Sequence, residues 1–418
     1  MRSIVRSTMK YNTAVIGGGP AGMIAAGFSA ENNKKVVLIE KNERAGKKLL
    51  ITGKGRCNIT NAEENVRSFI EKFGKKGKFL YSALTAFGVQ DIISFFEKRG
   101  LELKVERGMR VFPKSDSSRD VLQVLLDFLK QNNVEVLLHS KVKKIEKKDN
   151  KITKIILSNA QEIIADNYIL ATGGLSYPTT GSSGDGYVWL KELGHTIINP
   201  KPALVSILVK EPWIKELQGL SLKNVNISIF QGKKRDERFG EALFTDEGLS
   251  GPIILDMSRN IDDLLRDGPV ELFIDFKPAL DHNKLDLRIL RDFKENSNKR
   301  FKNSRDALLP QKLIPVIINL SQIGPEKLVN TITKEERRKI INLLKEFKLN
   351  VNSIDGFERA VITSGGVDLK EIDPKSMKSK LVDNLYIIGE LLDLDGPTGG
   401  FNLQVCWSTG YLAGIHNR

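Results

Sequence analysis

The stretch from Thr13 to Glu40 limits the fold of this 418-residue chain more than any other stretch does. Residues 14–16 and 36–39 are short apolar runs of the kind that fill buried parallel strands. Between them, GGGPAG opens a segment of helical character, and Glu40 closes the second run. Strand, glycine turn, helix, strand and acid in this order predict a βαβ unit that binds a dinucleotide. A βαβ turn without a ligand is the alternative.

Each residue of this unit has its own expected task. Gly17 lets the chain turn sharply off the strand, and Gly19 leaves room for a pyrophosphate. Gly22 lets the new helix pack close to the sheet, and the free N–H groups of the helix start face the phosphates. Glu40 lies where an acid accepts hydrogen bonds from a ribose.

Length and composition exclude several classes of protein. A chain of 418 residues with 40% hydrophobic residues predicts a globular protein of two or three domains. No apolar run approaches the ~18 residues of a membrane span, and the basic N-terminus lacks the apolar core of a secretory signal. The two cysteines form no CxxC pair, which favours a reducing cytoplasm, and no metal site is predicted. The net charge of +14 comes from widely spread lysines, a pattern that favours ordinary solvation.

The first half of the chain predicts alternating helices and strands. Residues 65–100 have helical spacing, 101–105 and 109–112 predict a hairpin, and 119–131 predict an amphipathic helix after capping candidates at 115–118. Residues 134–170 predict four strands with a turn at Asp149-Asn150, and 186–193 a helix. His195 follows that helix and is expected to be structural, with a catalytic role as the alternative.

A glycine-rich loop follows Glu40. Gly46, Gly53 and Gly55 are too closely spaced for an ordinary helix or strand. A loop leaving the second strand runs over the carboxyl edge of the sheet, so its polar residues are expected to border the cofactor. Arg56 and Asn58 are candidates for orienting a substrate, whereas Cys57 has no dithiol partner and is expected to pack. A surface Ω loop is the alternative.

The chain changes character near residues 199–202. Alternating runs at 204–209, 225–230 and 270–276 predict a β-rich module. Residues 281–350 have helical spacing and carry 16 Lys and Arg against 9 Asp and Glu. A solvated helical face explains this excess, and a nucleic-acid contact is the alternative.

The last sixty residues return to ligand chemistry. Residues 360–367 predict a strand entering a glycine turn, and 385–390 a buried strand that ends in Gly389-Glu390. Gly399 and Gly400 precede a helix of small and apolar residues, whose bare N–H groups point at an electron-rich group. Earlier, ATGG at 171–174 ends a predicted strand with small residues that allow a ligand to approach.

Together these segments resemble the FAD-binding fold of the glutathione reductase type. Nearly the whole chain looks more specifically like the BaiN-type, aminoacetone-oxidase-like flavoproteins. That similarity rests on GGGPAG at 17–22, TGKGRCNITN at 52–61, VFPKS at 111–115, ATGG at 171–174, GDGY at 184–187, LFTDEGLSGP at 243–252, TSGGV at 363–367 and GELLDLDGPTGGFNLQ at 389–404. The chain departs from the family at Asp246, where a histidine is common, and at Lys378, where an acid is common.

The resemblance implies an α/β fold with a discontinuous Rossmann-like FAD-binding domain at 1–198 and 358–418. It further implies an inserted β-barrel-like domain at 199–280 and about 345–357, and a small helical domain at 281–344. Non-covalent FAD is the implied cofactor. The residues expected to bind it are Gly17, Gly19, Pro20, Ala21, Gly22, Glu40, Lys41, Gly53, Gly55, Arg56, Cys57, Asn58, Val142, Ala171, Thr172, Gly173, Gly389, Glu390, Gly399, Gly400, Phe401 and Asn402.

The expected reaction is hydride transfer on the flavin. The start of the last helix is expected near the pyrimidine edge of the ring, and Arg56, Asn58 and Asn402 are the candidate catalytic or orienting groups. The sequence shows no second GxGxxG with strand and acid, so either NAD(P)H docks transiently or a small organic substrate reacts with the flavin directly. A flavoprotein that modifies or binds RNA through the basic helical segment is the competing hypothesis, and the lack of aromatic residues among those bases argues against it.

Overall fold

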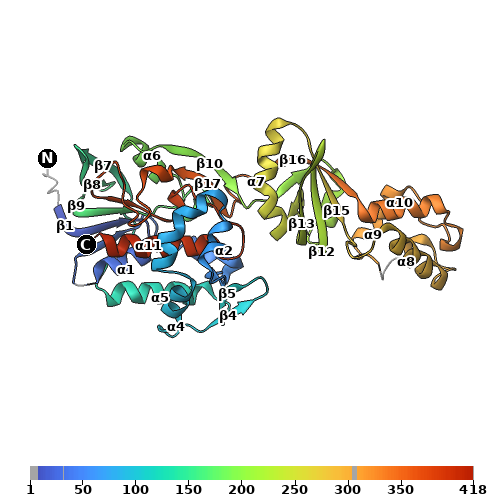
Figure 1. Ribbon diagram of the computed structural model, residues 1–418, viewed down its shortest axis with the longest axis horizontal. Coiled ribbons are helices and arrows are strands. Elements are labelled where there is room, and N and C mark those ends of the chain that lie inside the picture. Colours follow the sequence, from blue (N-terminus) through green and yellow to red (C-terminus); the bar gives the residue numbers. More distant parts are fainter. Residues whose placement is uncertain (1–7, 32, 304–307, 418) are drawn as a thin grey trace. The chain divides into compact units, whose positions relative to one another are not determined.

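A computed structural model describes residues 8–31, 33–303 and 308–417 (Figure 1). In its seven-stranded sheet, four parallel strands end at the same edge. The chain divides into two compact units at Ala203/Leu204 and at Arg359/Ala360. The sheet belongs to the unit built from both ends of the chain. The division falls a few residues after the expected position 199, because strand β10 (Ile197–Ala203) pairs with β17 (Ile362–Val367).

The sheet has the order β6-β2-β1-β9-β8-β7, and β18 pairs with β9. Strands β6, β2, β1, β9 and β18 run parallel, whereas β7 and β8 are antiparallel to their neighbours. The segment 134–170 thus contains the four strands that the sequence predicts. The strands are β1 (Thr8–Ile16), β2 (Val36–Ile39), β6 (Glu135–Leu137), β7 (Val142–Lys148), β8 (Lys151–Leu157), β9 (Glu162–Leu170) and β18 (Leu385–Ile387).

The register of the parallel strands decides where their loops emerge. Ile16 pairs with Ile39 on one side and with Leu170 on the other, and Leu170 pairs with Ile387. The glycine turn, Glu40, the ATGG segment and Gly389 therefore leave the sheet at the same edge. Carboxyl ends of parallel strands are where open α/β folds bind ligands.

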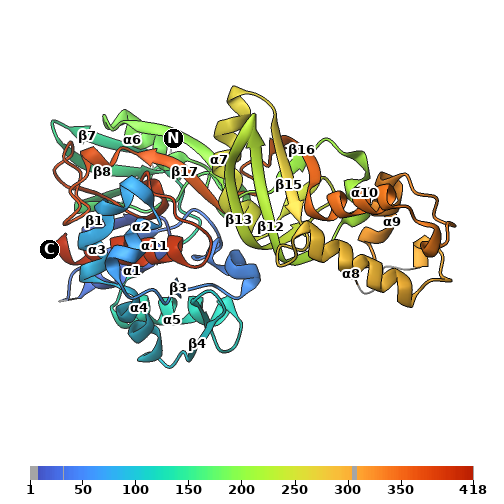
Figure 2. The same cartoon turned by 45° about the vertical axis from the view of Figure 1, so that its right-hand side comes forward.

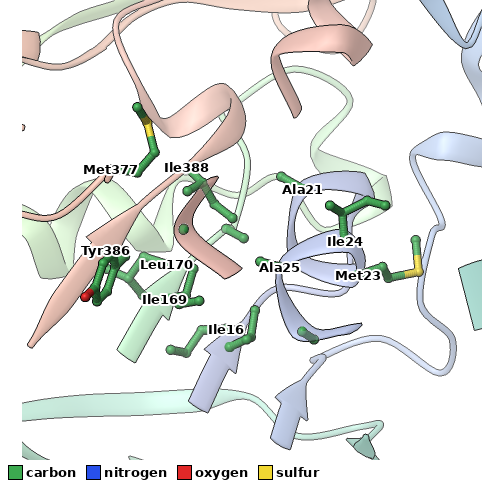
Figure 3. Close-up of a cluster of buried hydrophobic side chains, with 14 of the residues drawn as sticks. Ile16, Ala21, Met23, Ile24, Ala25, Ile169, Leu170, Met377, Tyr386 and Ile388 are labelled. Atoms are coloured by element: carbon green, nitrogen blue, oxygen red, sulfur yellow. The ribbon is translucent and has the colours of Figure 1, made fainter. Parts of the chain in front are cut away.

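Apolar packing holds this edge together. Figure 3 shows Ile16, Ile169 and Leu170 of the strands, with Ile388 just after β18, near Ala21, Ile24 and Ala25 of helix α1 (Pro20–Ala30). Each of these side chains is nearly or fully buried, so strands and helix share one core. The small residues of α1 let the helix lie close to the sheet.

The remaining elements of this unit cover the sheet or extend its edge. Helix α5 buries the predicted stripe of Val121, Leu122, Leu125, Phe128 and Leu129. Its N-cap Ser117 makes no side-chain cap, and the next residue, Ser118, donates from Oγ to the Leu50 carbonyl. The helices are α2 (Val66–Glu71), α3 (Tyr81–Ala86), α4 (Val89–Glu97), α5 (Ser118–Gln131), α6 (Asp185–Glu192) and α11 (Phe401–His416), and the small sheet β3-β5-β4 contains Thr60–Asn61, Arg110–Pro113 and Leu103–Glu106.

One local expectation is wrong. Gly365 and Gly366 do not form a turn after the strand at 360–367, because they lie inside β17 with positive φ angles of 90° and 134°. A Cβ on Gly365 would stand 2.6 Å from the Asn199 carbonyl oxygen, so the paired strands approach too closely for a side chain.

The second unit contains a closed barrel with the order β11-β14-β13-β12-β15-β16. Helices α8, α9 and α10 share one hydrophobic cluster with the barrel, so the helical segment packs as part of this unit. The helical pattern expected up to residue 350 ends earlier, because β16 begins at Phe347 and closes the barrel. The elements are β11 (Ile207–Val209), β12 (Ser221–Gln231), β13 (Lys233–Phe244), β14 (Gly248–Ser250), α7 (Pro252–Asp267), β15 (Val270–Asp275), α8 (His282–Glu295), α9 (Leu313–Ser321), α10 (Lys334–Lys345) and β16 (Phe347–Ile354).

Within the described residues, no single helix has both the length and the apolar character needed to cross a membrane; one bent pair, Gly74–Ala86 with Val89–Glu97, meets the criteria jointly by length and composition alone.

Candidate functional site

The glycine turn leaves the start of α1 open to a ligand. A Cβ on Gly17 would lie 2.5 Å from the Ala171 carbonyl oxygen, and one on Gly22 would lie 1.9 Å from the Gly17 carbonyl oxygen. These two glycines therefore allow the close approach of turn, helix and β9. A Cβ on Gly19 would meet nothing within 4 Å, so the space beside the helix N-terminus is free for a phosphate.

Glu40 stabilises the glycine turn through hydrogen bonds. Its Oε2 accepts from the Gly18 N–H at 2.8 Å, and its Oε1 accepts from the backbone N–H and the side-chain amide of Asn42, both at 2.8 Å. The residue is only 7% exposed. Oε2 has one donor among the described residues and can accept a second hydrogen bond, so the acid can also accept from a ribose hydroxyl.

Two neighbours of Glu40 carry further predicted residues. Lys41 Nζ contacts Ser183 Oγ at 2.5 Å and Asp185 Oδ2 at 2.8 Å, which ties the end of β2 to the start of α6. Ser140 donates its N–H to the Glu40 carbonyl, and Val142 follows at the buried start of β7. Both segments therefore border the acid that the sequence assigns to the ribose.

The end of β9 contains an unsatisfied polar atom. Thr172 Oγ1 is buried and has no hydrogen-bond partner among the described residues. It stands between Ala171 and Gly173, and a Cβ on Gly186 of α6 would lie 2.1 Å from it. A buried hydroxyl without a partner costs free energy, which a ligand with a polar group would relieve.

The loop after Glu40 contains a second such atom. Asn58 Oδ1 is also buried without a partner among the described residues. The loop is irregular: Gly53 and Lys54 have left-handed φ angles of 56° and 59°, and Gly55 has φ 83°. Of the three polar candidates for orienting a substrate, Asn58 is the one with a buried side-chain oxygen that has no partner among the described residues.

Cys57 is part of the core. Its side chain is fully buried, and burial raises the pKa of the thiol to about 12. A neutral, inaccessible thiol has the properties of a packing residue and not those of a nucleophile.

Arg56 is already paired with carboxylates. Its Nη1 lies 2.9 Å from Glu106 Oε1 and 3.1 Å from Asp116 Oδ1, and its guanidinium carbon lies 4.0 Å from the centroid of the Phe112 ring. Lys104 joins the same group through Asp116 at 2.6 Å. The structure thus gives Arg56 the role of holding the loop against the β4–β5 hairpin.

Asn402 is likewise engaged within its own turn. Its Oδ1 accepts from the Gly396 N–H at 2.8 Å, and its Nδ2 donates to the carbonyls of Gly396 and Pro397 at 3.0 and 3.2 Å. The side chain closes the loop that precedes α11, so it positions the helix start instead of reaching outward.

The start of α11 packs against strand β3. Gly400 has φ 102°, and a Cβ there would lie 2.3 Å from the Thr60 carbonyl carbon. Thr60 Oγ1 donates to Gln404 Oε1 at 2.6 Å, and Asn61 Nδ2 donates to the Gly399 carbonyl at 3.1 Å. These bonds fix the N–H groups of Phe401 and its neighbours at the sheet edge.

Helices α1 and α11 run side by side in the same direction (Figures 1 and 2). Gly410 lies against Ala21, and Gly414 lies against Ala25. Residue 409 is therefore level with Pro20, and α11 begins eight residues earlier, about 12 Å beyond the start of α1 at 1.5 Å per residue. The N-termini of the two helices, each with a positive partial charge, are thus offset along the direction of the helix axes.

Gly389 and Glu390 lie between these two helix starts. A Cβ on Gly389 would be 3.0 Å from Ala21 Cβ of α1 and 3.7 Å from Cys406 Sγ of α11. Glu390 does not stand free. Lys48 Nζ, which the sequence reasoning did not single out, lies 2.7 Å from Glu390 Oε2. Lys48 belongs to none of the sequence motifs named above, and the fold alone brings it close to Glu390.

Two further residues named in the sequence analysis are His195 and Asp246. Both ring nitrogens of His195 are satisfied, Nδ1 by Glu371 Oε2 at 3.0 Å and Nε2 by Ser379 Oγ at 2.9 Å, and burial lowers the pKa of its ring. This confirms the expected structural role. Asp246 is exposed in the turn between β13 and β14 of the second unit.

Comparison with known proteins places nearly the whole chain in one family. The sequence pattern described as "HI0933-like protein Rossmann domain" matches residues 11–416. The chain is 31% identical over 403 residues to the 3-dehydro-bile acid delta(4,6)-reductase of Clostridium scindens, covering 96% of this chain and 97% of that protein. It is 30% identical over 406 residues to the ribosomal RNA dihydrouridine synthase of Haemophilus influenzae, covering 96% and 97%, and 29% identical to that of Escherichia coli, covering 96% of each.

Solved structures share the fold at lower identity. The 3-ketosteroid-delta4-(5alpha)-dehydrogenase of Rhodococcus jostii aligns with a TM-score of 0.55 at 12% identity, over 100% of this chain and 98% of that one. A flavocytochrome c3 fumarate reductase aligns with a TM-score of 0.53 at 16% identity, over 98% of this chain and 78% of that one. At such identities the likeness concerns the fold alone.

Proposed function

Because the chain belongs to the HI0933-like family of Rossmann-domain proteins and is an FAD-dependent oxidoreductase, we propose that it reduces a carbon–carbon double bond conjugated to a carbonyl group. The two kinds of relative carry this proposal. One is named as a delta(4,6)-reductase of a 3-dehydro-bile acid. The other is named for making dihydrouridine, in which the ring double bond of uracil beside a carbonyl is saturated.

The site fits FAD on two independent grounds. The space at Gly19 and the free N–H groups of α1 suit a diphosphate, and the partnerless oxygens of Thr172 and Asn58 suit a ligand with several polar groups. The start of α11, about 12 Å further along the same line, suits the electron-rich end of a long cofactor. FAD supplies two-electron redox chemistry when it is bound there.

We propose that some of the residues predicted from the sequence contact the cofactor or the substrate, and that others hold the surrounding loops in place. The N–H groups from Gly19 to Gly22 bind the diphosphate, Glu40 accepts from the ribose, and Thr172 and Asn58 contact the cofactor or the substrate. Arg56, Asn402 and Cys57 hold the surrounding loops, because their polar atoms are engaged or buried.

Reduction of the conjugated bond adds a hydride to the carbon remote from the carbonyl and a proton to the nearer carbon. It requires a two-electron donor, and we propose NAD(P)H in transient contact. The lack of a second glycine motif with strand and acid in the sequence supports transient docking over a dedicated nicotinamide domain.

A direct experiment tests the reaction class. The FAD-loaded protein is reduced anaerobically with NADH or NADPH, and a 3-oxo-4,6-diene bile acid or unmodified ribosomal RNA is then added. We expect one of these to restore the absorbance of oxidised flavin and to gain two hydrogen atoms by mass spectrometry. If neither compound reoxidises the flavin while oxygen does so rapidly, the protein is an oxidase and the proposal is wrong.

The outer face of α8 favours uracil in RNA as the second candidate substrate. Lys284, Leu287, Arg291 and Lys294 follow one another at helical spacing opposite the buried Leu285, Ile289 and Phe293. The Lys284 and Arg291 side chains are 69% and 61% exposed, and Leu287 is 67% exposed. Without aromatic residues on this face, its cations would contact phosphates and add affinity without sequence preference.

This second candidate has its own test. The variant Lys284→Glu/Arg291→Glu/Lys294→Glu is compared with Lys339→Glu on the mixed-charge outer face of α10. If RNA is the substrate, the triple variant should bind ribosomal RNA more weakly, with a shallower salt dependence, and keep its reduction by NAD(P)H. Equal RNA binding by the two variants would show that the α8 cations do not contribute to RNA binding.

A further inference from the structure

The outer face of the barrel in the second unit carries aromatic side chains. Strand β12 pairs with β13 on one side and with β15 on the other, and Figure 2 shows these strands side by side. Ile227 and Ile229 of β12 are fully buried inside the barrel, so Ser228 and Phe230, which alternate with them, face outward. Phe273 of β15 pairs with Ser228 and therefore lies on the same outer face.

Phe239 of β13 adds a third ring to this face. It pairs with Asn226, another outward position of β12, and is 62% exposed. Phe230 and Phe273 are partly exposed, and their ring centroids lie 5.0 Å apart. Asn226 precedes Phe230 by four residues, which corresponds to about 13 Å along β12 at about 3.3 Å per residue. We call Phe230, Phe239 and Phe273 the phenylalanine face.

Basic side chains lie beside the phenylalanine face. Lys348 of β16 pairs with Phe273, and its Nζ lies 5.9 Å from the centroid of that ring. Lys234 of β13 pairs with Phe230. Each of these two strand pairings therefore brings a lysine next to an outward ring.

The charge that is left unpaired beside the rings is positive. Each neighbouring acid pairs with a lysine at 2.5 or 2.6 Å: Glu237 with Lys234, Glu271 with Lys348 and Asp275 with Lys345. Lys233 and Arg235, next to the turn between β12 and β13, are exposed and form no ion pair with any described residue. A partner with flat rings and negative charge complements such a surface.

Single-stranded RNA has both properties. Its unpaired bases stack on aromatic side chains, and its phosphates bind Lys and Arg. RNA-binding sheets present outward aromatic residues to bases in this way. A duplex keeps its bases stacked inside the helix and cannot use the rings. A second copy of this chain would bring the same positive charge to the face, and repulsion would oppose its binding.

We propose that the phenylalanine face binds unpaired bases of RNA by stacking, while Lys233 and Arg235 contact the phosphates. The choice of partner rests on RNA as the second candidate substrate proposed above. The inference adds an aromatic surface to the cations of α8, which belong to the same unit. It also specifies the kind of RNA, because stacking on the rings requires bases that are not paired.

Binding of short RNA to the FAD-loaded protein tests the proposal. The probes are a labelled oligouridylate of about 12 nucleotides and an RNA duplex of the same length, titrated by fluorescence anisotropy at several salt concentrations. Phe239→Ala removes an exposed ring, and Phe273→Leu removes a ring but keeps an apolar side chain. Tyr81→Ala is the matched control, since Tyr81 is an aromatic residue that is 52% exposed on α3 of the other unit.

The expected result is a selective loss of single-strand binding. Phe239→Ala and Phe273→Leu should each weaken oligouridylate binding about tenfold and leave duplex binding and flavin reduction by NAD(P)H as in Tyr81→Ala. The slope of the salt dependence should stay unchanged, because stacking releases no counterions, whereas loss of the α8 cations should make it shallower.

Three results would overturn the inference. They are equal oligouridylate affinity in the two phenylalanine variants and Tyr81→Ala, a preference of the parent protein for the duplex, and self-association of the parent that Phe239→Ala abolishes. The last result would assign the face to a second copy of the chain. Oligouridylate binding that depends on the rings, in a protein whose reduced flavin is not reoxidised by ribosomal RNA, would support the surface and reject RNA as the substrate.

Discussion

Gly410 of α11 lies so close to Ala21 of α1 that a Cβ carbon on Gly410 would stand 2.6 Å from the Ala21 carbonyl oxygen. One turn further along, Gly414 approaches Ala25 in the same way, at 3.0 Å. These contacts fix both the separation of the two helices and their relative shift. The last helix of the chain is thereby positioned by the first.

Gly410→Ala should therefore lower stability and cofactor content together. The added methyl forces the helices apart, and overpacking of a tight core costs about 1–3 kcal/mol. The displaced α11 should also release FAD. Melting temperature and bound flavin are the measurements, and Gly356→Ala is the control, because a Cβ there meets only the mobile end of the Glu358 side chain. Equal behaviour of the two variants would contradict the proposed helix register.

Gly19→Val should give a folded but colourless protein. The backbone of Gly19, at φ −78° and ψ −179°, suits a β-branched residue, and no atom lies within 4 Å of its Cβ position. The valine would occupy the space that we assign to the diphosphate. The expected result is a melting temperature of the apoprotein close to that of the parent, with little FAD released on denaturation. Normal FAD content would place the diphosphate elsewhere, and release of FMN in place of FAD by the parent would refute a dinucleotide cofactor.

Arg56→Ala and Cys57→Ser should differ in their effect on the flavin. Loss of Arg56 frees the loop from Glu106 and Asp116, so we expect lower FAD content and slower reduction by NAD(P)H. Cys57→Ser should stay close to the parent in both, because the thiol is neutral and buried. Rapid-mixing absorbance of the flavin checks the rates. A large effect of Cys57→Ser with little effect of Arg56→Ala would indicate that the thiol takes part in the reaction and would contradict the hydride-transfer mechanism.

Stability should fall as the pH drops below about 6.5, the ordinary pKa of histidine, in part because of His195. Burial lowers the pKa of His195 in the folded state, so the unfolded chain takes up the proton first and gains free energy relative to the fold. His195→Gln should make the free energy of unfolding less dependent on pH between about pH 7 and pH 5. The exposed His282, changed to Gln, is the control and should follow the parent. A pH dependence that is unchanged in His195→Gln would assign the effect to other groups.

Local sequence determined the nucleotide-binding half of this site. The apolar runs at 14–16 and 36–39 with GGGPAG between them are sufficient for strand, turn and helix, because burial period and glycine spacing act over a few residues. The small residues after β9 and before α11 likewise predict that a ligand or another chain segment approaches the backbone closely there. Motif order also identified the family and its flavin cofactor.

Tertiary structure decided which polar groups stay available. Arg56, Asn58 and Asn402 are equally polar in sequence, yet Arg56 meets two acids of a distant hairpin and Asn402 bonds to its own turn, so only Asn58 keeps an unsatisfied oxygen. Lys48 is one of two adjacent lysines, and its contact with Glu390 spans 342 residues of chain. Such pairings depend on the register of β1, β2, β9 and β18, a long-range property that no local pattern specifies.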